Sequence, residues 1–285
     1  MKDLQGKVAF ITGGAGGIGL GMAEVFRDAG MNLVLADMDQ GALDRAETQL
    51  RSKTGGEILL LKLDVTNRDA MKEAADAVDA RLGGIHVLCN NAGVNAPGPL
   101  QDLGYADWDW VLGVNLDGVI NGLVTFLPRM LARGEPGHIV NTASVGGLLG
   151  MPNLGIYCAS KFAVVGLSES LKHDLADTPI GVSLLAPGIV RSGIAQSERN
   201  RPEKFGGPPP KREEAAAAAA FGTDPVDLGR QVLAAIEADA FYICTHAEFR
   251  SYVEQRGDSL LSAFQGEPDA ELQAAMAPIV GPILR

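Results

Sequence analysis

Seven short runs of apolar residues recur along the chain, separated by segments that are long enough for helices. The runs are nearly continuous in Val, Ile and Leu, which is typical of strands covered by helices on both faces. Helical crossovers between consecutive strands place those strands parallel to one another. We therefore predict an α/β fold built on a doubly wound parallel sheet of about seven strands. The predicted strands are KVAFIT, NLVLAD, EILLLKLDV, HVLCNNAG, GHIVNTAS, GVSLLAPG and AFYICTH.

The composition of the chain indicates which kinds of partner to expect. The chain has 285 residues and a formal net charge of -11, without the basic stripe of a nucleic-acid-binding protein or a polybasic membrane patch. We expect a small-molecule substrate and neither a nucleic-acid nor a membrane partner, because no apolar segment reaches membrane-spanning length. The amino terminus lacks the features of a secretory signal, and the three unclustered cysteines favour free thiols in the cytoplasm. The four histidines are scattered, so no metal site is expected.

One segment interrupts the regular pattern. Residues 192–222, called the lid segment below, combine charges, three consecutive prolines and an alanine run that Glu213 and Glu214 precede. The alanines are compatible with a short helix. Such a long loop is either a surface insertion or functional, and its place after a strand's carboxyl end favours a lid over a binding site. We predict one domain over residues 1–285, with the lid segment and a C-terminal extension at 247–285.

A glycine-rich turn follows the first predicted strand and leads into an amphipathic helix. Glycines in TGGAGGIGLG permit a tight turn and close approach of the backbone to a pyrophosphate, while the helix N-terminus supplies amide donors. The turn therefore predicts dinucleotide binding of the Rossmann type. Two registers fit the residues alone, namely Gly14, Gly16 and Gly19, or Gly13, Gly17 and Gly19.

The choice of cofactor rests on Asp37, at the end of the second predicted strand. It lies eighteen residues after Gly19, close to the spacing of the carboxylate that binds an adenosine ribose. Its charge would repel the 2′-phosphate of NADP, and neither Ala36 nor Met38 offers a guanidinium to accept that phosphate. The predicted cofactor is therefore NAD.

Further motifs join these features in a fixed order. They are Thr12-Gly13 with Gly17 and Gly19, the NNAG of residues 90–93, Asn115, Ser144, Tyr157 with Lys161, and Pro187-Gly188. Over residues 5–192 the chain resembles the short-chain dehydrogenase/reductase family. The resemblance selects the register Gly13, Gly17 and Gly19, and it implies an NAD-dependent enzyme that interconverts a secondary alcohol and its ketone. It also implies a homo-oligomer, a tetramer or a dimer, built on helices over residues 107–133 and 154–177.

The resemblance assigns four catalytic residues. Tyr157 is expected to be the general acid/base. Lys161 follows four residues later on the same helix face, and is expected to lower the pKa of Tyr157 together with the positive nicotinamide ring and to hold the nicotinamide ribose. Ser144 is expected to hydrogen-bond the substrate oxygen, and Asn115 to hold a water that links Lys161 to solvent.

The resemblance also implies cofactor contacts along the ends of the strands. Asp64 and Val65 would bind the adenine, Ile189 would meet the carboxamide through its backbone, and Ser192 stands where the family has a threonine. Cys158 points elsewhere on its helix, so we interpret it as a core residue. The complete predicted cofactor set is Thr12, Gly13, Gly17, Ile18, Gly19, Asp37, Asp64, Val65, Asn91, Ala92, Gly93, Tyr157, Lys161, Pro187, Gly188, Ile189 and Ser192.

A narrower likeness concerns the substrate. Three runs are similar to those of bacterial NAD-dependent Cα-dehydrogenases that oxidise benzylic alcohols of lignin-derived aryl ethers, and they span residues 95–130, 192–206 and 241–250. This likeness favours a bulky aryl alcohol, which Ile194, Phe205 and Phe221 of the lid segment would cover. The alternatives are another apolar secondary alcohol such as a hydroxysteroid or cyclic alcohol, a sugar-nucleotide epimerase or dehydratase, and a non-catalytic nucleotide-binding regulator.

Overall fold

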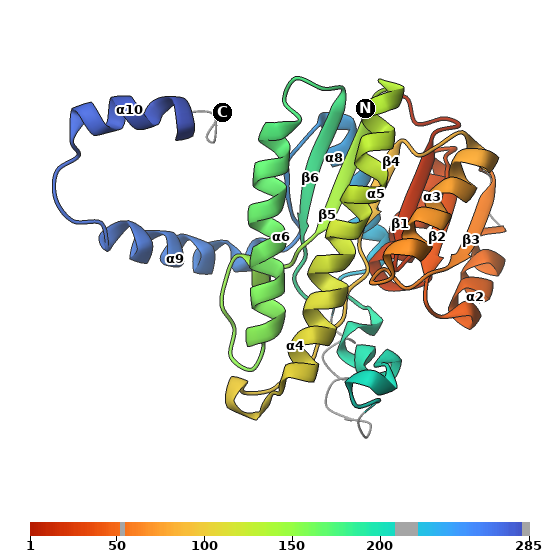
Figure 1. The fold of residues 1–285 in the computed structure, drawn as a ribbon, viewed down its shortest axis with the longest axis horizontal. Coiled ribbons are helices and arrows are strands. Elements are labelled where there is room, and N and C mark those ends of the chain that lie inside the picture. The colour runs from red at the N-terminus through yellow and green to blue at the C-terminus, as the bar shows by residue number, and fades with distance from the viewer. Residues whose placement is uncertain (52–54, 209–221, 281–285) are drawn as a thin grey trace.

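A seven-stranded sheet forms the centre of the protein (Figure 1). The computed structural model describes the backbone of residues 1–51, 55–208 and 222–280. All strands pair in parallel, in the order β3-β2-β1-β4-β5-β6-β7, so the predicted parallel sheet is confirmed. The strands are β1 (Val8–Thr12), β2 (Asn32–Asp37), β3 (Ile58–Lys62), β4 (Val87–Asn90), β5 (Gly137–Thr142), β6 (Ile180–Ala186) and β7 (Tyr242–Cys244).

Helices cover both faces of the sheet, so the fold is doubly wound as predicted. The helices on the face toward the viewer in Figure 1 are α3 (Arg68–Leu82), α5 (Gly118–Arg133) and α6 (Gly155–Asp174). Those on the opposite face are α1 (Gly17–Asp28), α2 (Gln40–Arg51) and α8 (Pro225–Ala238). The remaining α-helices of the described residues are α4 (Tyr105–Leu112), α9 (Arg250–Ser262) and α10 (Ala270–Val280).

Alternate residues of each strand enter two separate cores. In β1, Phe10 points toward α5, where its ring centre lies 4.5 Å from that of Phe126. The next residue, Ile11, packs in the opposite core with Met22 and Phe26 of α1. All five residues of β1 are buried. The near-continuous apolar runs of the sequence are thus explained, because every position in such a strand packs against a helix.

The carboxyl ends of the seven strands meet at one edge of the sheet. β1 lies between β2 and β4, with β3 beyond β2 and the later strands beyond β4. In doubly wound sheets the crevice outside such a reversal of strand order is the place where ligands bind. The glycine turn after β1 and residues 91–93 after β4 lie at this reversal of strand order.

The two long helices expected at 107–133 and 154–177 are confirmed in place but differ in detail. The first consists of α4 and α5 joined by a π-helical turn, Gly113–Asp117. The second is α6, which ends at Asp174. A π turn inserts an extra residue into a helix and frequently occurs at functional positions. Apolar periodicity alone did not reveal it.

The helical run Tyr105–Arg133 corrects the expectation that no apolar segment reaches membrane-spanning length. Among the described residues it is the one candidate span by length and composition, with a mean hydropathy of 1.4 over an 18-residue window. Of that window, 44% is buried inside the protein. Val119, Phe126 and Met130 of α5 pack in the core against the sheet. The apolar composition of this run is therefore that of a helix covering a sheet.

The two regions predicted to be irregular differ in what the structure describes. In the lid segment, residues 192–208 form the 3₁₀ segments η4 (Gly193–Asn200) and η5 (Glu203–Phe205). The predicted alanine helix and Phe221 lie outside the described residues. In the C-terminal extension, α9 and α10 project from the body of the protein (Figure 1), and no residue of 250–277 is buried.

Helices α1 and α8 approach so closely that a side chain is excluded where they meet. A Cβ added to Gly229 would lie 2.5 Å from the carbonyl oxygen of Gly21. We expect Gly229→Ala to lower the free energy of unfolding by about 1–3 kcal/mol, because the overpacked helices must move apart. Gly41→Ala in α2 is the matched control, since its added Cβ would meet nothing closer than 3.4 Å. Urea unfolding compares the two, and equal stabilities would contradict the prediction.

Candidate active site

The sheet brings most of the predicted site residues to the edge where the strands end. They are the glycine turn after β1, Asp37 in β2, residues 91–93 after β4, Ser144 after β5 and residues 187–188 after β6. Helical residues reach the same edge. Lys161 contacts the end of β5, and Asn115 contacts the chain after β4. The predicted constellation is therefore brought together at one place.

Close backbone contacts explain the glycines of the turn between β1 and α1. A Cβ on Gly19 would lie 2.1 Å from the carbonyl oxygen of Gly13. Gly13 and Gly17 have left-handed φ angles of +62° and +50°, which favour glycine. Gly16 precedes α1 without a side-chain cap, and a Cβ there would meet nothing within 4 Å. The turn is therefore packed on its protein side and open beside the N-terminus of α1.

Thr12 and Asn91 join the end of β1 to the segment after β4. The Thr12 hydroxyl accepts hydrogen bonds from the amides of Asn91 at 2.9 Å and Ala92 at 3.0 Å. The Asn91 side chain donates to the Thr12 carbonyl oxygen at 3.0 Å and accepts from the Thr142 hydroxyl at 3.3 Å. Both side chains thus tie the end of β1 to the segment after β4.

The Asp37 carboxylate is oriented by backbone groups beside the glycine turn. It accepts hydrogen bonds from the amides of Ala15 at 3.3 Å and Asp39 at 3.1 Å. Burial raises the pKa of this carboxyl, and the backbone hydrogen bonds oppose that rise. The neighbouring Met38 side chain is exposed. The carboxylate therefore lies beside the glycine turn, next to an apolar side chain.

These groups fit a dinucleotide cofactor. The uncapped N-terminus of α1 offers amide donors and the positive end of a helix dipole to a pyrophosphate. Asp37 offers acceptor oxygens to a ribose diol. Among the described residues, no group of three or more His, Cys, Asp and Glu side chains could hold a metal ion.

Ser144 and Tyr157 meet between the end of β5 and the start of α6. The buried Ser144 hydroxyl accepts a hydrogen bond from the Gly146 amide at 3.1 Å and lies 3.3 Å from the carbonyl oxygen of Pro187. It also hydrogen-bonds the Tyr157 phenol. The Tyr157 ring reaches the same place, since a Cβ added to Gly146 would lie 3.4 Å from Cε1 of that ring.

Lys161 is buried beside the Tyr157 ring. Its ammonium donates to the Thr142 carbonyl oxygen at 2.9 Å and lies 5.6 Å from the centre of that ring. Burial lowers the pKa of Lys161 to about 8. Burial also raises the pKa of Tyr157, although the Ser144 hydrogen bond opposes this. In the protein without cofactor, removal from water is the largest influence on the phenol. The predicted lowering of the Tyr157 pKa involves the bound nicotinamide ring as well as Lys161, and it stays a prediction.

Asn115 occupies the π turn and is fully buried. Its side chain accepts from the Val94 amide at 2.8 Å and donates to the Val94 carbonyl at 3.0 Å and the Ser160 hydroxyl at 3.1 Å. A Cβ on Gly93 would lie 3.5 Å from Asn115 Oδ1 and 3.6 Å from Lys161 Nζ. The two polar atoms therefore face one small space beside Gly93.

An apolar cluster, distinct from the two cores of the sheet, joins the segment after β4 to α4, to the start of α6 and to the lid segment. Phe205 of the lid segment packs against it, and its buried members are Val94, Ala96, Trp110, Val111 and Ile156. Arg201 anchors the lid segment here, because its guanidinium pairs with Asp107 of α4 at 2.6 Å and lies 5.4 Å from the centre of the Trp110 ring. Sequence reasoning missed this anchor, whose two charged residues are 94 positions apart.

The other predicted cofactor residues lie in loops around these groups. β3 ends before Asp64 and Val65, so both lie in the following loop, where Asp64 accepts a hydrogen bond from the Thr66 amide at 2.9 Å. Ile189 is exposed. Ser192 packs against the glycine turn. Sequence reasoning also gave no role to the histidine after β7, which contacts residues 188 and 189.

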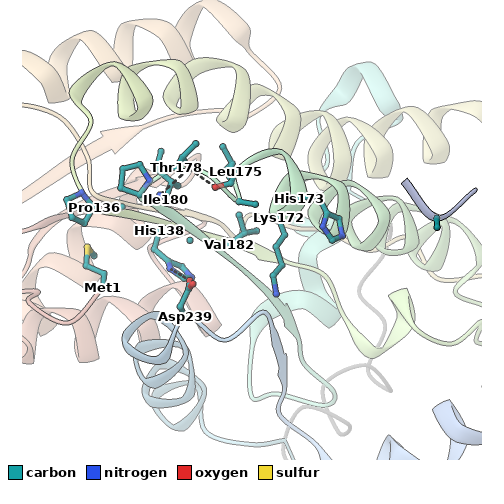
Figure 2. Close-up of a pocket in the computed structure, with 15 residues that line it drawn as sticks. Met1, Pro136, His138, Lys172, His173, Leu175, Thr178, Ile180, Val182 and Asp239 are labelled. Atoms are coloured by element: carbon teal, nitrogen blue, oxygen red, sulfur yellow. Dashed lines mark hydrogen bonds and ion pairs between the residues drawn. The ribbon is translucent and has the colours of Figure 1, made fainter. Parts of the chain in front are cut away.

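A cavity of about 950 Å³ lies away from all these groups. It is found where β5 and β6 begin, at the opposite edge of the sheet, and Figure 2 shows His138, Lys172 and Ile180 around it. Burial lowers the pKa of His138 to about 4. None of the residues that line the cavity belongs to the predicted site. We therefore do not assign the reaction to this cavity.

Comparison with known proteins identifies the family. The family model described as short chain dehydrogenase matches residues 7–203. The chain belongs to the short-chain dehydrogenase family. It is similar to the C alpha-dehydrogenase of Sphingobium sp. (strain NBRC 103272 / SYK-6), with 39% identity over 97% of this chain and 93% of that protein. It is also similar to the CLA biosynthesis dehydrogenase/reductase of Lactiplantibacillus plantarum, with 32% identity over 95% of this chain and 98% of that protein.

A solved structure supports the same conclusion. This short-chain dehydrogenase is similar to a short chain dehydrogenase/reductase from Burkholderia phymatum, solved in complex with NAD. The two share 41% identity with a TM-score of 0.85, over 95% of this chain and 100% of that chain. The protein is therefore an oxidoreductase.

Burial of Lys161 makes the stability of this short-chain dehydrogenase depend on pH. Its pKa of about 8 in the folded protein lies below the ordinary value of 10.5, so the unfolded chain binds more protons between these values. The free energy of unfolding therefore rises with pH in that window. We expect Lys161 to contribute about 2 kcal/mol of this rise from pH 8 to pH 10. Urea unfolding of wild type and Lys161→Met without cofactor measures the contribution, and parallel pH profiles would exclude it.

Proposed function

We propose that the protein is an NAD-dependent dehydrogenase that interconverts a secondary alcohol and its ketone, with bulky aryl alcohols as its substrate class. The observation that carries this proposal is the placement of the Ser144 hydroxyl and the Tyr157 ring around Gly146, with the buried Lys161 ammonium beside that ring. Two adjacent hydroxyl groups suit the binding of one alcohol or carbonyl oxygen. Membership of the short-chain dehydrogenase family supports the reaction type.

Tyr157 is the group that we propose to move the proton. Its phenol donates a proton to the carbonyl oxygen during reduction, and its phenolate takes the hydroxyl proton during oxidation. Ser144 donates a hydrogen bond to the same oxygen and stabilises the negative charge that develops there. A bound nicotinamide cofactor supplies hydride exchange with the substrate carbon. Because burial raises the pKa of Tyr157, the protonated form that reduction requires is favoured in the cofactor-free protein.

Lys161 and Asn115 form the proposed route for this proton to solvent. Their polar atoms face the same space beside Gly93, where a water would accept from the lysine and donate to the Asn115 oxygen. The pKa of about 8 allows Lys161 to lose and regain a proton near neutral pH. We also assign to Lys161 the binding of the nicotinamide ribose.

Replacement of the tyrosine tests the catalytic assignment. We expect Tyr157→Phe to lower kcat by at least about a hundredfold, because it removes the transferable proton while it keeps the ring. The Kd for NAD, measured by calorimetry, should change little. Tyr252→Phe in α9 is the matched control, since it removes a phenol hydroxyl from the exposed extension. Retained turnover in Tyr157→Phe would assign the proton transfer to another group.

The preference for NAD over NADP rests on the surroundings of Asp37. Its carboxylate is fixed beside the glycine turn, and the adjacent side chain is an exposed methionine without charge. A negative charge at this place favours a ribose diol and disfavours a ribose phosphate. The NAD complex of the similar Burkholderia phymatum protein supports this choice.

A double substitution tests the preference. We expect Asp37→Ala with Met38→Arg to lower kcat/KM for NAD by about tenfold or more, because a charge-assisted hydrogen bond to the ribose is lost. The new guanidinium should reduce or reverse the difference in kcat/KM between NAD and NADP. Asp39→Ala, which removes the neighbouring carboxylate, is the control. Equal efficiencies with NAD and NADP in the wild type would reject the assignment of Asp37.

The aryl substrate class is proposed from the apolar cluster at the start of α6, the helix that carries Tyr157. Phe205 brings the lid segment to this cluster. Apolar and aromatic walls with a few convergent polar groups suit a bulky apolar ligand. The similarity to a protein named C alpha-dehydrogenase agrees with this class. We assign Ile194 and Phe205 to the covering of the substrate.

A substrate panel tests the class. We expect 1-aryl alcohols and aryl ketones to give at least about tenfold higher kcat/KM than short aliphatic ones, because each buried methylene contributes roughly 0.8 kcal/mol. Phe205→Ala should reduce this ratio. Phe264→Ala is the matched control, since it removes an exposed phenyl ring from the C-terminal extension. A preference for small aliphatic alcohols would exclude the proposed substrate class.

Assembly and compartment are also proposals. We infer a homo-oligomer, a tetramer or a dimer, that uses the α4–α5 run and α6, because α5 exposes Val124 and Leu131. We infer a cytoplasmic enzyme, because Cys89, Cys158 and Cys244 are all free thiols.

A further inference from the structure

His246 lies just beyond β7, at the same edge of the sheet as the candidate active site. Its ring is hydrogen-bonded to the loop after β6, residues 187–190, which we call the cofactor loop. The Gly188 amide donates to Nδ1 at 3.1 Å, and Nε2 lies 2.9 Å from the Ile189 carbonyl oxygen. The Thr245 hydroxyl is also 2.7 Å from Nδ1. One imidazole therefore contacts two successive residues of the cofactor loop.

The backbone partners decide which ring nitrogen of His246 carries the proton. An amide nitrogen such as that of Gly188 only donates, so Nδ1 must accept. A carbonyl oxygen such as that of Ile189 only accepts, so Nε2 must donate. Both contacts are satisfied at once by the neutral ring with its hydrogen on Nε2. The backbone of the cofactor loop therefore selects this tautomer of His246. The two hydrogen bonds of that tautomer in turn hold the loop in place.

Packing adds to these hydrogen bonds. A Cβ on Gly188 would lie 2.7 Å from Cγ of His246 and 2.8 Å from Cε2 of Phe249. The two rings lie 6.4 Å apart at 69°, so they form an edge-to-face pair over the glycine. Because Gly188 has no side chain, the His246 imidazole can approach the backbone within hydrogen-bonding distance.

The same ring also contacts Thr223, the residue that follows the lid segment. The Thr223 hydroxyl lies 3.0 Å from Nε2 of His246, and the Thr223 amide donates to the Ile189 carbonyl oxygen at 2.9 Å. Val190 and Thr223 form an isolated parallel bridge. His246 therefore joins the turn after β7, the cofactor loop and the point where the lid segment rejoins the body.

We propose that His246 is a positioning residue that holds the backbone of the cofactor loop in the conformation that binds the nicotinamide end of the cofactor. It acts through Gly188 and Ile189 and touches neither the substrate nor the reacting atoms. This inference rests on the proposed function, in which the Ile189 backbone meets the cofactor carboxamide. A backbone segment beyond its strand lacks ladder partners, so a side chain from the neighbouring strand end supplies them.

Three substitutions separate the contributions of the ring. His246→Phe keeps an aromatic ring against Phe249 but removes both hydrogen bonds. His246→Asn places an amide oxygen near the position of Nδ1, where it can accept from the Gly188 amide. His246→Gln extends an amide NH₂ group toward the position of Nε2, where it can donate to the Ile189 carbonyl oxygen. His173→Asn on α6, near the opposite edge of the sheet, is the matched control.

The measurements combine cofactor affinity with the order of the loop in the protein alone. We expect His246→Phe to raise the Kd for NAD about tenfold, as the loss of two modest hydrogen bonds implies. It should also speed hydrogen exchange of the Gly188 amide in cofactor-free protein. At saturating NAD, kcat of this variant should fall by a smaller factor than its affinity for NAD. The Asn and Gln variants should each recover part of the affinity, and ¹⁵N spectra of the wild-type ring should show an unprotonated Nδ1.

The outcomes distinguish this inference from the proposed function. Unchanged Gly188 exchange or an unchanged Kd in His246→Phe would overturn the positioning role. An equal loss of affinity in His173→Asn would overturn it as well, since the effect would then not be local. A wild type that does not bind NAD rejects the proposed cofactor, whereas faster Gly188 exchange in His246→Phe would still support the fixing of the loop.

Discussion

The parallel pairing of seven strands is the constraint on which the rest of the structure depends. Parallel strands need helical crossovers, and the helices bury both faces of the sheet, so apolar side chains predominate inside the strands. Buried polar side chains inside strands, such as His138 and Ser183, are hydrogen-bonded to each other, and most of the candidate site residues lie at or just beyond the strand ends. Because all the strands run in one direction, those residues gather at one edge. Ser144 after β5 and Pro187 after β6 become neighbours in this way, although they are 43 positions apart in the chain.

Burial sets the electrostatics of the candidate site. Tyr157 and Lys161 are both withdrawn from water, and each therefore has a pKa displaced toward its neutral form. A tyrosine–lysine pair in isolation suggests that the cation stabilises a phenolate, but that argument applies where the Coulomb attraction exceeds the desolvation of both groups. Here the ammonium donates to the Thr142 carbonyl oxygen instead of the phenol. The hydroxyl of Ser144 is the group that directly opposes the rise in the Tyr157 pKa.

Local patterns in the sequence predicted the sheet and the glycine turn, because each depends on residue types within one strand or turn. The grouping of Ser144 with Tyr157 came from the resemblance to the short-chain dehydrogenase/reductase family. The π turn that holds Asn115 could not be predicted, since a single inserted residue hardly changes the apolar periodicity of a long helix. The direction of the Tyr157 pKa shift was also beyond the sequence, because it depends on how many atoms surround the phenol.

The contacts that escaped sequence reasoning share one physical origin. A loop beyond the end of a strand has lost its ladder partners, and its amides and carbonyls must be satisfied by side chains of other loops. The Asn95 amide accordingly donates to the Ser197 hydroxyl, 102 positions away, and the Gly188 amide donates to His246, 58 positions away. Such hydrogen-bonded pairs produce no periodic pattern in a sequence, because each of them needs only one suitable residue at each of two distant positions. The glycine turn can be predicted from the sequence, since its geometry depends on the backbone of consecutive residues. A site at strand ends therefore has a glycine turn that can be predicted from the sequence, together with contacts between distant loops, in the cofactor loop and in the lid segment, that cannot.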